Sequence, residues 1–192
     1  MATEVLVKVG TQIRFCVAGS FSPADAGTNW TIGTPTDVAL TLSALADGAG
    51  RQSAKVDLGA TRAREYEVLG CVDFTLETPV SAAVVDYYWA PSVSGTAGTG
   101  NVAGNSGADA AAPDGATPAG ITLAEFLRLC IYIGSLVVSD DAAVQNGYVG
   151  RFSPPGRYGQ LVVINESGDA FEADDVEAHQ VMNPIVDEIQ TT

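Results

Sequence analysis

The chain has 192 residues, 46% of them hydrophobic and 17% charged, which is enough for one domain with a substantial core. Its formal net charge is −14 at pH 7, with 23 acidic residues against 9 lysines and arginines. A chain this acidic repels phosphate backbones and anionic bilayers, so we expect no nucleic acid and no membrane among its partners.

Apolar and polar residues alternate through most of the chain, which predicts short strands with one face in a core. The predicted strands span 4–9, 12–17, 37–44, 65–77, 84–89, 131–139, 145–152, 160–165 and 177–187. The clearest core faces are Tyr66, Val68, Val72, Phe74 and Leu76, and then Val85, Tyr87 and Trp89. Pro184 is expected to mark an edge, a bend or a bulge in the last strand.

Turn signals separate these segments at the spacing of an all-β domain. Asp47-Gly48, Asn146-Gly147 and Pro154-Pro155-Gly156 are examples. The pattern therefore predicts an all-β fold in which residues 1–192 form a single antiparallel β-sandwich, of the jelly-roll type.

One short helix is expected inside this β pattern. Thr122 and Glu125 have the spacing of a capping box, in which each side chain accepts a hydrogen bond from the other residue's backbone N–H. Apolar residues follow at helical spacing, so we predict a helix over residues 123–129 that closes one end of the sandwich.

Two glycine-containing loops are candidates for contacts with other proteins. Segment 91–120 is almost entirely Ser, Gly, Thr, Ala, Asn, Asp and Pro. Such a segment buries too little surface to order itself, so we expect either a flexible loop or an arm that a neighbouring subunit orders. Loop 19–33 carries Phe21 and Trp30, which either cap the domain's own core or anchor on a partner.

The cysteines are an odd set of three, Cys16, Cys71 and Cys130, each inside an apolar run. We expect three reduced, buried thiols and no disulfide framework. The first residues have neither a basic segment nor a long apolar one, so no secretory signal is expected, in agreement with synthesis in a reducing cytosol.

No catalytic, cofactor or metal site is predicted. His179, the only histidine, lies in an acidic run and is expected on the surface. Zinc would need several His or Cys ligands at short spacing, and the glycines of 95–107 lack the context of a phosphate-binding loop. The acidic segment 169–177 could offer oxygen ligands to Ca²⁺, but a solvated loop is favoured.

The predicted partner-binding residues are Phe21, Trp30, Arg151 and Arg157. The two arginines flank Phe152–Gly156, and they are candidates for pairing with acidic residues of a neighbour.

Four segments carry a resemblance to a known group of proteins. They are Arg51–Gly59, Tyr132–Val138, Gly147–Gly159 and Asn183–Glu188. They resemble small structural proteins of tailed bacteriophages, and the likeness covers roughly residues 40–190. The resemblance implies a virion component assembled in the host cytoplasm, most specifically a capsid decoration (cement) protein. Its partners would be the major capsid protein or other virion proteins, and it would form a homo-oligomer, with a trimer favoured.

Other interpretations stay open. The chain could be a tail- or collar-associated adaptor, or a carbohydrate-binding module in which Trp30, Tyr87, Tyr88 and Trp89 are candidates for stacking on sugars. The alternation at Tyr87 and Trp89 places at least two of these aromatics in the core. A hydrolase would need two facing carboxylates in a cleft, a pattern that the sequence does not indicate.

Overall fold

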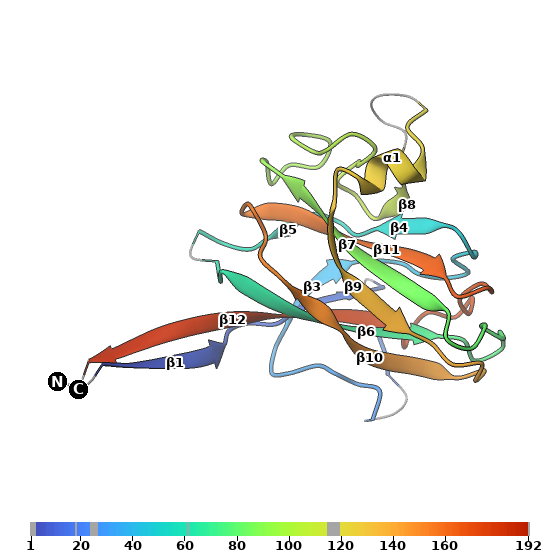
Figure 1. The fold of residues 1–192 in the computed structure, drawn as a ribbon, viewed down its shortest axis with the longest axis horizontal. Coiled ribbons are helices and arrows are strands. Elements are labelled where there is room, and N and C mark those ends of the chain that lie inside the picture. Colours follow the sequence, from blue (N-terminus) through green and yellow to red (C-terminus); the bar gives the residue numbers. More distant parts are fainter. Residues whose placement is uncertain (1–2, 18, 24–26, 61, 115–119, 192) are drawn as a thin grey trace.

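The computed structural model describes the whole chain except residues 1–2, 18, 24–26, 61, 115–119 and 192, and of 3–9 and 186–191 it describes the backbone alone. Its strands form two sheets (Figure 1). Sheet A contains β1 (Thr3–Val9), β2 (Ile13–Cys16), β3 (Thr36–Ala39), β6 (Glu65–Asp73), β10 (Val144–Phe152) and β12 (His179–Thr191). Sheet B contains β4 (Gly50–Gln52), β5 (Val56–Asp57), β7 (Val84–Ser92), β8 (Ala110–Ala112), β9 (Ile131–Val137) and β11 (Tyr158–Glu166).

The strand order is β10-β6-β12-β2-β3 in sheet A, where β1 also pairs with β12. In sheet B it is β8-β4-β11-β7-β9, where β5 also pairs with β11. The pairing is antiparallel apart from the parallel pair β2 and β3. The predicted all-β class is confirmed, and the jelly-roll topology stays a prediction.

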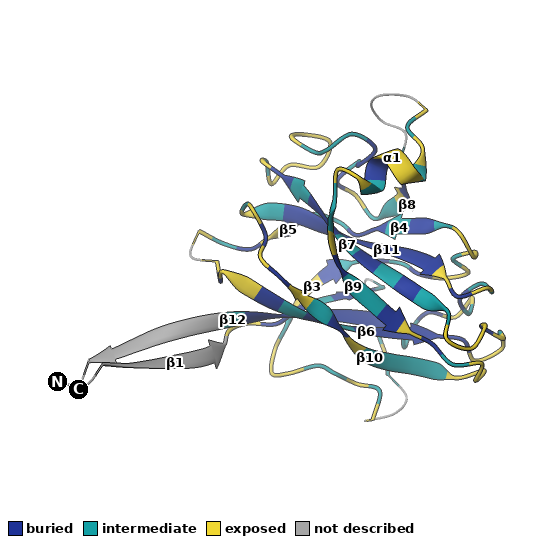
Figure 2. Ribbon diagram, in the orientation of Figure 1, coloured by how far each residue is buried: buried dark blue, intermediate teal, exposed yellow. Residues whose placement is uncertain are grey.

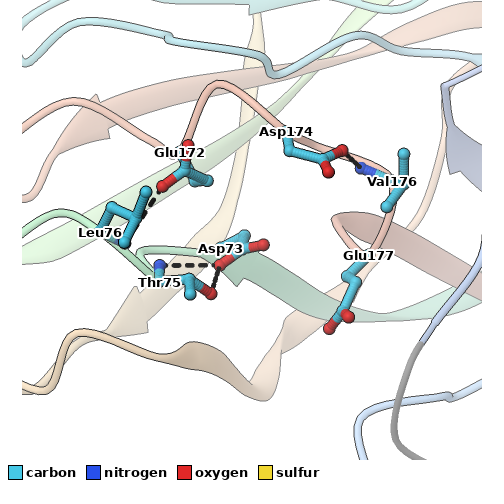
Figure 3. Close-up of a pocket in the computed structure, with 7 residues that line it drawn as sticks. All are labelled: Asp73, Thr75, Leu76, Glu172, Asp174, Val176 and Glu177. Atoms are coloured by element: carbon cyan, nitrogen blue, oxygen red, sulfur yellow. Dashed lines mark hydrogen bonds between the residues drawn. The ribbon is translucent and has the colours of Figure 1, made fainter.

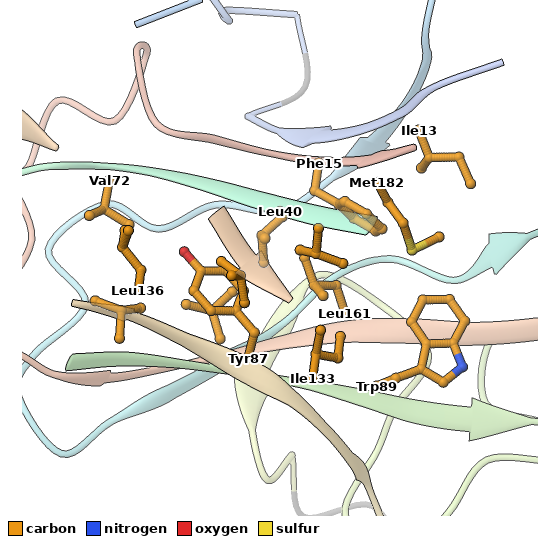
Figure 4. Close-up of a cluster of buried hydrophobic side chains, with 14 of the residues drawn as sticks. Ile13, Phe15, Leu40, Val72, Tyr87, Trp89, Ile133, Leu136, Leu161 and Met182 are labelled. Carbon is orange, nitrogen blue, oxygen red and sulfur yellow. The ribbon is translucent and has the colours of Figure 1, made fainter. Parts of the chain in front are cut away.

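The main core lies between the two sheets, so the fold is a sandwich (Figures 2 and 4). Phe15 and Met182 contribute to it from sheet A, and Tyr87, Trp89 and Leu161 from sheet B; all five are 0% exposed. Burying a large apolar side chain stabilises a fold by roughly 1.5–3 kcal/mol. This layer is therefore what holds the two sheets together.

The predicted core faces are confirmed except at Leu76. Val85, Tyr87 and Trp89 are fully buried, but Leu76 is 80% exposed. Strand β6 ends at Asp73, whose Oδ1 accepts the backbone N–H of Thr75 at 2.8 Å. This local bond turns the chain out of the sheet before Leu76 is reached.

Helix α1 (Leu123–Leu127) lies against the outer face of sheet B. Both hydrogen bonds of the predicted capping box are present between Thr122 and Glu125. Phe126 is fully buried and packs in a second apolar cluster with Val162 and Ile164, which point outward from sheet B. The helix thus covers a sheet face, rather than closing an end of the sandwich as predicted.

The long loop that follows β7 packs against sheet B of the same chain. The structure describes this loop up to Asp114 and again from Gly120. Its β8 pairs with β4, and Asn105 Nδ2 donates to Gln160 Oε1 of β11 at 3.0 Å. Arg51 Nε donates to Asp109 Oδ1 at 2.7 Å. Hydrogen bonds to the sheet therefore order a segment whose composition predicts either disorder or order imposed by a neighbour.

Strand β12 changes its neighbour at Pro184. It pairs with β2 through Met182 and with β1 from Ile185 onward, while β6 pairs along its other edge. The Pro184 carbonyl accepts Gly10 N on the β1 side, so the ring nitrogen faces the gap between β2 and β1. A residue without an N–H fits this gap, although β12 is an interior strand. Beyond the gap, β1 and β12 form a two-stranded ribbon that extends from the body with both chain ends at its tip (Figure 1).

Candidate protein-binding surface

The outer face of sheet A combines apolar and aromatic residues in register. Tyr148, Leu69 and Val181 pair across β10, β6 and β12, and so share one face. The next row consists of Arg151, Glu67 and Asn183. Tyr148 is 55% exposed, whereas Val181 is 1% exposed because a loop covers this end of the row.

The covering loop is part of the predicted 19–33 segment, and two buried polar side chains attach it to the sheet. Gln12 Nε2 donates to the Trp30 carbonyl at 3.0 Å, and Gln12 Oε1 accepts Ile32 N at 3.0 Å. His179 Nε2 accepts the Trp30 backbone N–H at 3.2 Å. Gln12 and His179 are 2% and 1% exposed, so the prediction of a surface histidine is wrong.

The same loop and the outer face border a groove of about 450 Å³. Leu69 and Val181 are among its apolar lining residues, together with Trp30 and Ile32. Ile32 is 59% exposed. Glu67 contributes a carboxylate, one oxygen of which accepts Asn183 Nδ2 at 3.0 Å.

The four predicted partner-binding residues do not form one cluster of free side chains. Trp30 is half-buried and lines the groove. Phe21 packs on its own chain, with its ring centroid 4.8 Å from that of His179 and the Arg14 guanidinium 4.2 Å over its face.

The two arginines are paired within the chain. Arg151 lies in the row of Glu67, on the groove side of the sandwich, and donates to Glu65 at 2.7 Å. Arg157 belongs to the sheet B layer, where it donates to both carboxylate oxygens of Asp57 at 2.6 and 2.7 Å. These bonds hold the pKa of Asp57 below its usual range. Contact with a neighbour's acid would compete with these pairs.

A second hollow, of about 290 Å³, is lined by carboxylates on the segment before β12 and on the turn after β6 (Figure 3). Glu172 accepts Leu76 N at 3.1 Å, and Asp73 accepts Thr75 N. Nearby, Asp175 accepts Leu42 N at 2.8 Å. Several of these carboxylates thus accept backbone N–H groups; Asp73 and Asp175 are buried, whereas Asp174 is exposed. Within the described residues, no group of three or more His, Cys, Asp or Glu could hold a metal ion.

His179 and the three cysteines are the side chains most relevant to nucleophilic chemistry. His179 Nδ1 donates to the Glu177 carbonyl at 2.7 Å while Nε2 accepts Trp30 N, so both ring nitrogens are occupied. The three cysteines are free; Cys16 and Cys71 are buried, and Cys130 is half-buried, which differs from the prediction. Burial raises the pKa of Cys71 and of Cys130 to about 12, so both thiols stay protonated at neutral pH.

No protein-family model, no curated protein and no solved structure matches the chain. No helix of the described residues is long and apolar enough to span a bilayer.

Proposed function

We propose that the chain is a non-catalytic structural protein that binds other proteins through the outer face of sheet A. We further propose that it is a decoration protein on the capsid of a tailed bacteriophage. The specific assignment draws on the sequence resemblance of 51–59, 132–138, 147–159 and 183–188. The binding face draws on the geometry of the groove.

The supporting observation is the exposed apolar strip beside the groove. Tyr148 and Ile32 are 55% and 59% exposed; Tyr148 pairs with Leu69, and Leu69, Trp30 and Ile32 line the groove. Interface centres are enriched in aromatic residues and depleted of charged ones. The charged side chains in the neighbouring row, Arg151 and Glu67, already have partners within the chain. This face can therefore be desolvated at lower cost than the acidic surface elsewhere.

Co-sedimentation with phage particles purified without this protein would test the proposal. We expect the wild-type protein to sediment with the particles and Tyr148→Ala to weaken that binding by about tenfold or more, as at an interface hot spot. Tyr132→Ala is the matched control, because Tyr132 is 53% exposed but belongs to β9 of sheet B.

Equal losses in the two variants would place the contact elsewhere. Failure of the wild-type protein to bind such particles at any concentration would refute the decoration assignment. Binding that Tyr148→Ala leaves unchanged would refute the choice of face.

A second candidate function is carbohydrate binding in the same groove. Tyr87 and Trp89 are fully buried and so cannot stack on a sugar, whereas the half-buried Trp30 lines the groove beside Glu67 and Asn29. An aromatic ring beside polar side chains is a common way to bind sugars. Binding on a glycan array that Trp30→Ala abolishes would favour this function over protein binding.

A further inference from the structure

The covering loop depends on a neutral imidazole. The Trp30 backbone N–H is a donor, so the nitrogen it reaches, His179 Nε2, must carry a lone pair. The other nitrogen, Nδ1, then carries the proton and donates it to the Glu177 carbonyl. One tautomer of the neutral ring satisfies both bonds, and the doubly protonated ring satisfies only the second.

The remaining contacts of the ring offer no ion-pair partner for a positive charge. His179 is 1% exposed, and on one side it faces the Phe21 ring at 4.8 Å. Of the charges around it, Arg14 disfavours the imidazolium, and Arg14 is itself bonded to Asp37. The charged and titratable groups of the packed strands are Arg14 and Cys16 on β2, Asp37 on β3, and Glu65, Tyr66, Glu67, Cys71 and Asp73 on β6. Asp174, Asp175 and Glu177 lie just before β12.

The two thiols among these groups are neutral, and two of the carboxylates already accept backbone N–H groups. Burial raises the pKa of Cys16 and of Cys71, so neither thiol supplies a negative charge. Asp73 accepts bonds from Thr75, and Asp175 accepts from Leu42 and Ser43. No carboxylate of the described residues forms an ion pair with the imidazole.

We propose that His179 and the segment Asn29–Ile32 form an acid-sensitive latch over the outer face of sheet A. The segment is held on the sheet while the imidazole is neutral. Protonation of Nε2 turns the acceptor of the Trp30 N–H into a second donor, so the two N–H groups oppose each other and the segment loses this attachment. The bonds from Gln12 to the Trp30 carbonyl and the Ile32 N–H, and from Arg14 to Thr31 Oγ1, do not involve the imidazole, so release is an opening against these remaining bonds. Release moves Trp30 and Ile32, and so changes the groove that they line. The latch does not depend on what the groove binds.

The sign of the pH dependence follows from the burial. Burial is the largest effect on the imidazole and lowers the pKa of His179 below its ordinary value of 6.5. The released loop leaves the ring in water with a higher pKa, and therefore binds protons more strongly than the latched form does. The latch is at full strength above about pH 6.5 and weakens as the pH falls towards the pKa of the latched state.

Amide hydrogen exchange and histidine nitrogen shifts, measured on one sample between pH 8 and pH 5, test the latch. His179 is the sole histidine, so its ring nitrogens give a single set of signals. After correction for intrinsic rates, protection of the Trp30 amide should fall by up to about tenfold for each pH unit below 6.5. The Val163 amide, in the core of β11, should stay protected and so distinguish loop release from global unfolding.

Two variants distinguish the effect of protonating His179 from the effect of protonating a nearby carboxylate. His179→Gln keeps an acceptor for Trp30 N that does not titrate, so its Trp30 protection should be independent of pH. Glu177→Gln keeps the backbone carbonyl that binds Nδ1, and should reproduce the wild-type pH profile. If His179→Gln does not fold, the nitrogen shifts of the wild-type protein still show which ring nitrogen of the neutral imidazole carries the proton.

Either of two results would overturn the latch. One is a neutral imidazole that carries its proton on Nε2, because that nitrogen could not then accept the Trp30 N–H. The other is protonation that leaves the Trp30 amide as protected as before.

Discussion

At the residue scale, two glycine backbones of the sandwich pack directly against large aromatic side chains. A Cβ added to Gly159 would clash with the indole ring of Trp89, and one added to Gly70 would clash with the phenol of Tyr87. Trp89 and Tyr87 are both fully buried, so neither ring can move into solvent. Glycine is required at both positions because a side chain would not fit beside the aromatic ring, and not because of the backbone angles.

We expect Gly159→Ala to lower the free energy of unfolding by about 1–3 kcal/mol or more, as overpacking does in other cores. Urea unfolding followed by Trp fluorescence would measure it. Gly156→Ala is the matched control, because its added Cβ meets nothing closer than Ser92 O at 3.6 Å. Similar stability of the two variants would show that β11 can shift away from Trp89.

Buried polar residues at the same scale were the least predictable part of the site. His179 is far in the sequence from the segment that it holds, with 149 positions between it and Trp30, whereas Gln12 is 18 positions from Trp30. The acidic neighbours of His179 indicated a surface position, but the loop that covers it is not visible in local periodicity. A usable signal was its place at the start of the alternation His179, Val181, Asn183, which puts it on a sheet face.

At the element scale, the long strands were predictable and the short ones were not. Strands β6, β7, β10 and β11 are each nine residues long; β6 and β7 alternate in burial over most of their length, whereas β11 contains a continuous apolar run buried on both faces. Strands β4, β5 and β8 have two or three residues, and β8 is Ala-Ala-Ala, which has no alternation to detect. Strands β4 and β5 form on the edge of the longer β11, and β8 then forms on β4, so tertiary structure decides these strands.

The long loop between β7 and α1 gives a prediction at this scale. Asn105 is 4% exposed; its Nδ2 donates to Gln160 Oε1, and its Oδ1 accepts Gly107 N at 2.8 Å. Asn105→Ala leaves both partners buried and unsatisfied, which costs about 1–3 kcal/mol. We expect faster proteolysis of the loop and lower stability in urea.

The control for this variant is Thr99→Ala, a change at an exposed position of the same loop. It should leave both the cleavage rate and the urea midpoint close to those of the wild-type protein. Equal cleavage of Asn105→Ala and Thr99→Ala would show that the described loop is held by its apolar contacts instead.

At the scale of the whole molecule, stability is set by apolar burial acting against electrostatic repulsion. Ion pairs such as Arg14–Asp37 and Arg151–Glu65 lie at the surface, where each contributes about 0–1 kcal/mol. The chain carries 23 acidic and 9 basic residues, so most carboxylates have no cation to pair with. Folding brings these unpaired charges closer together, and the resulting repulsion lowers the stability of the compact state.

Added salt should therefore stabilise this protein. Raising NaCl from about 20 mM to about 300 mM shortens the screening length severalfold and weakens long-range repulsion more than the close ion pairs. We expect Tm at pH 7 to rise by about 2–4 °C for each kcal/mol of repulsion that is removed. The same salt step near pH 4.1, where the net charge approaches zero, should change Tm far less. A Tm that falls with salt at pH 7 would mean that the ion pairs outweigh the repulsion between the unpaired carboxylates.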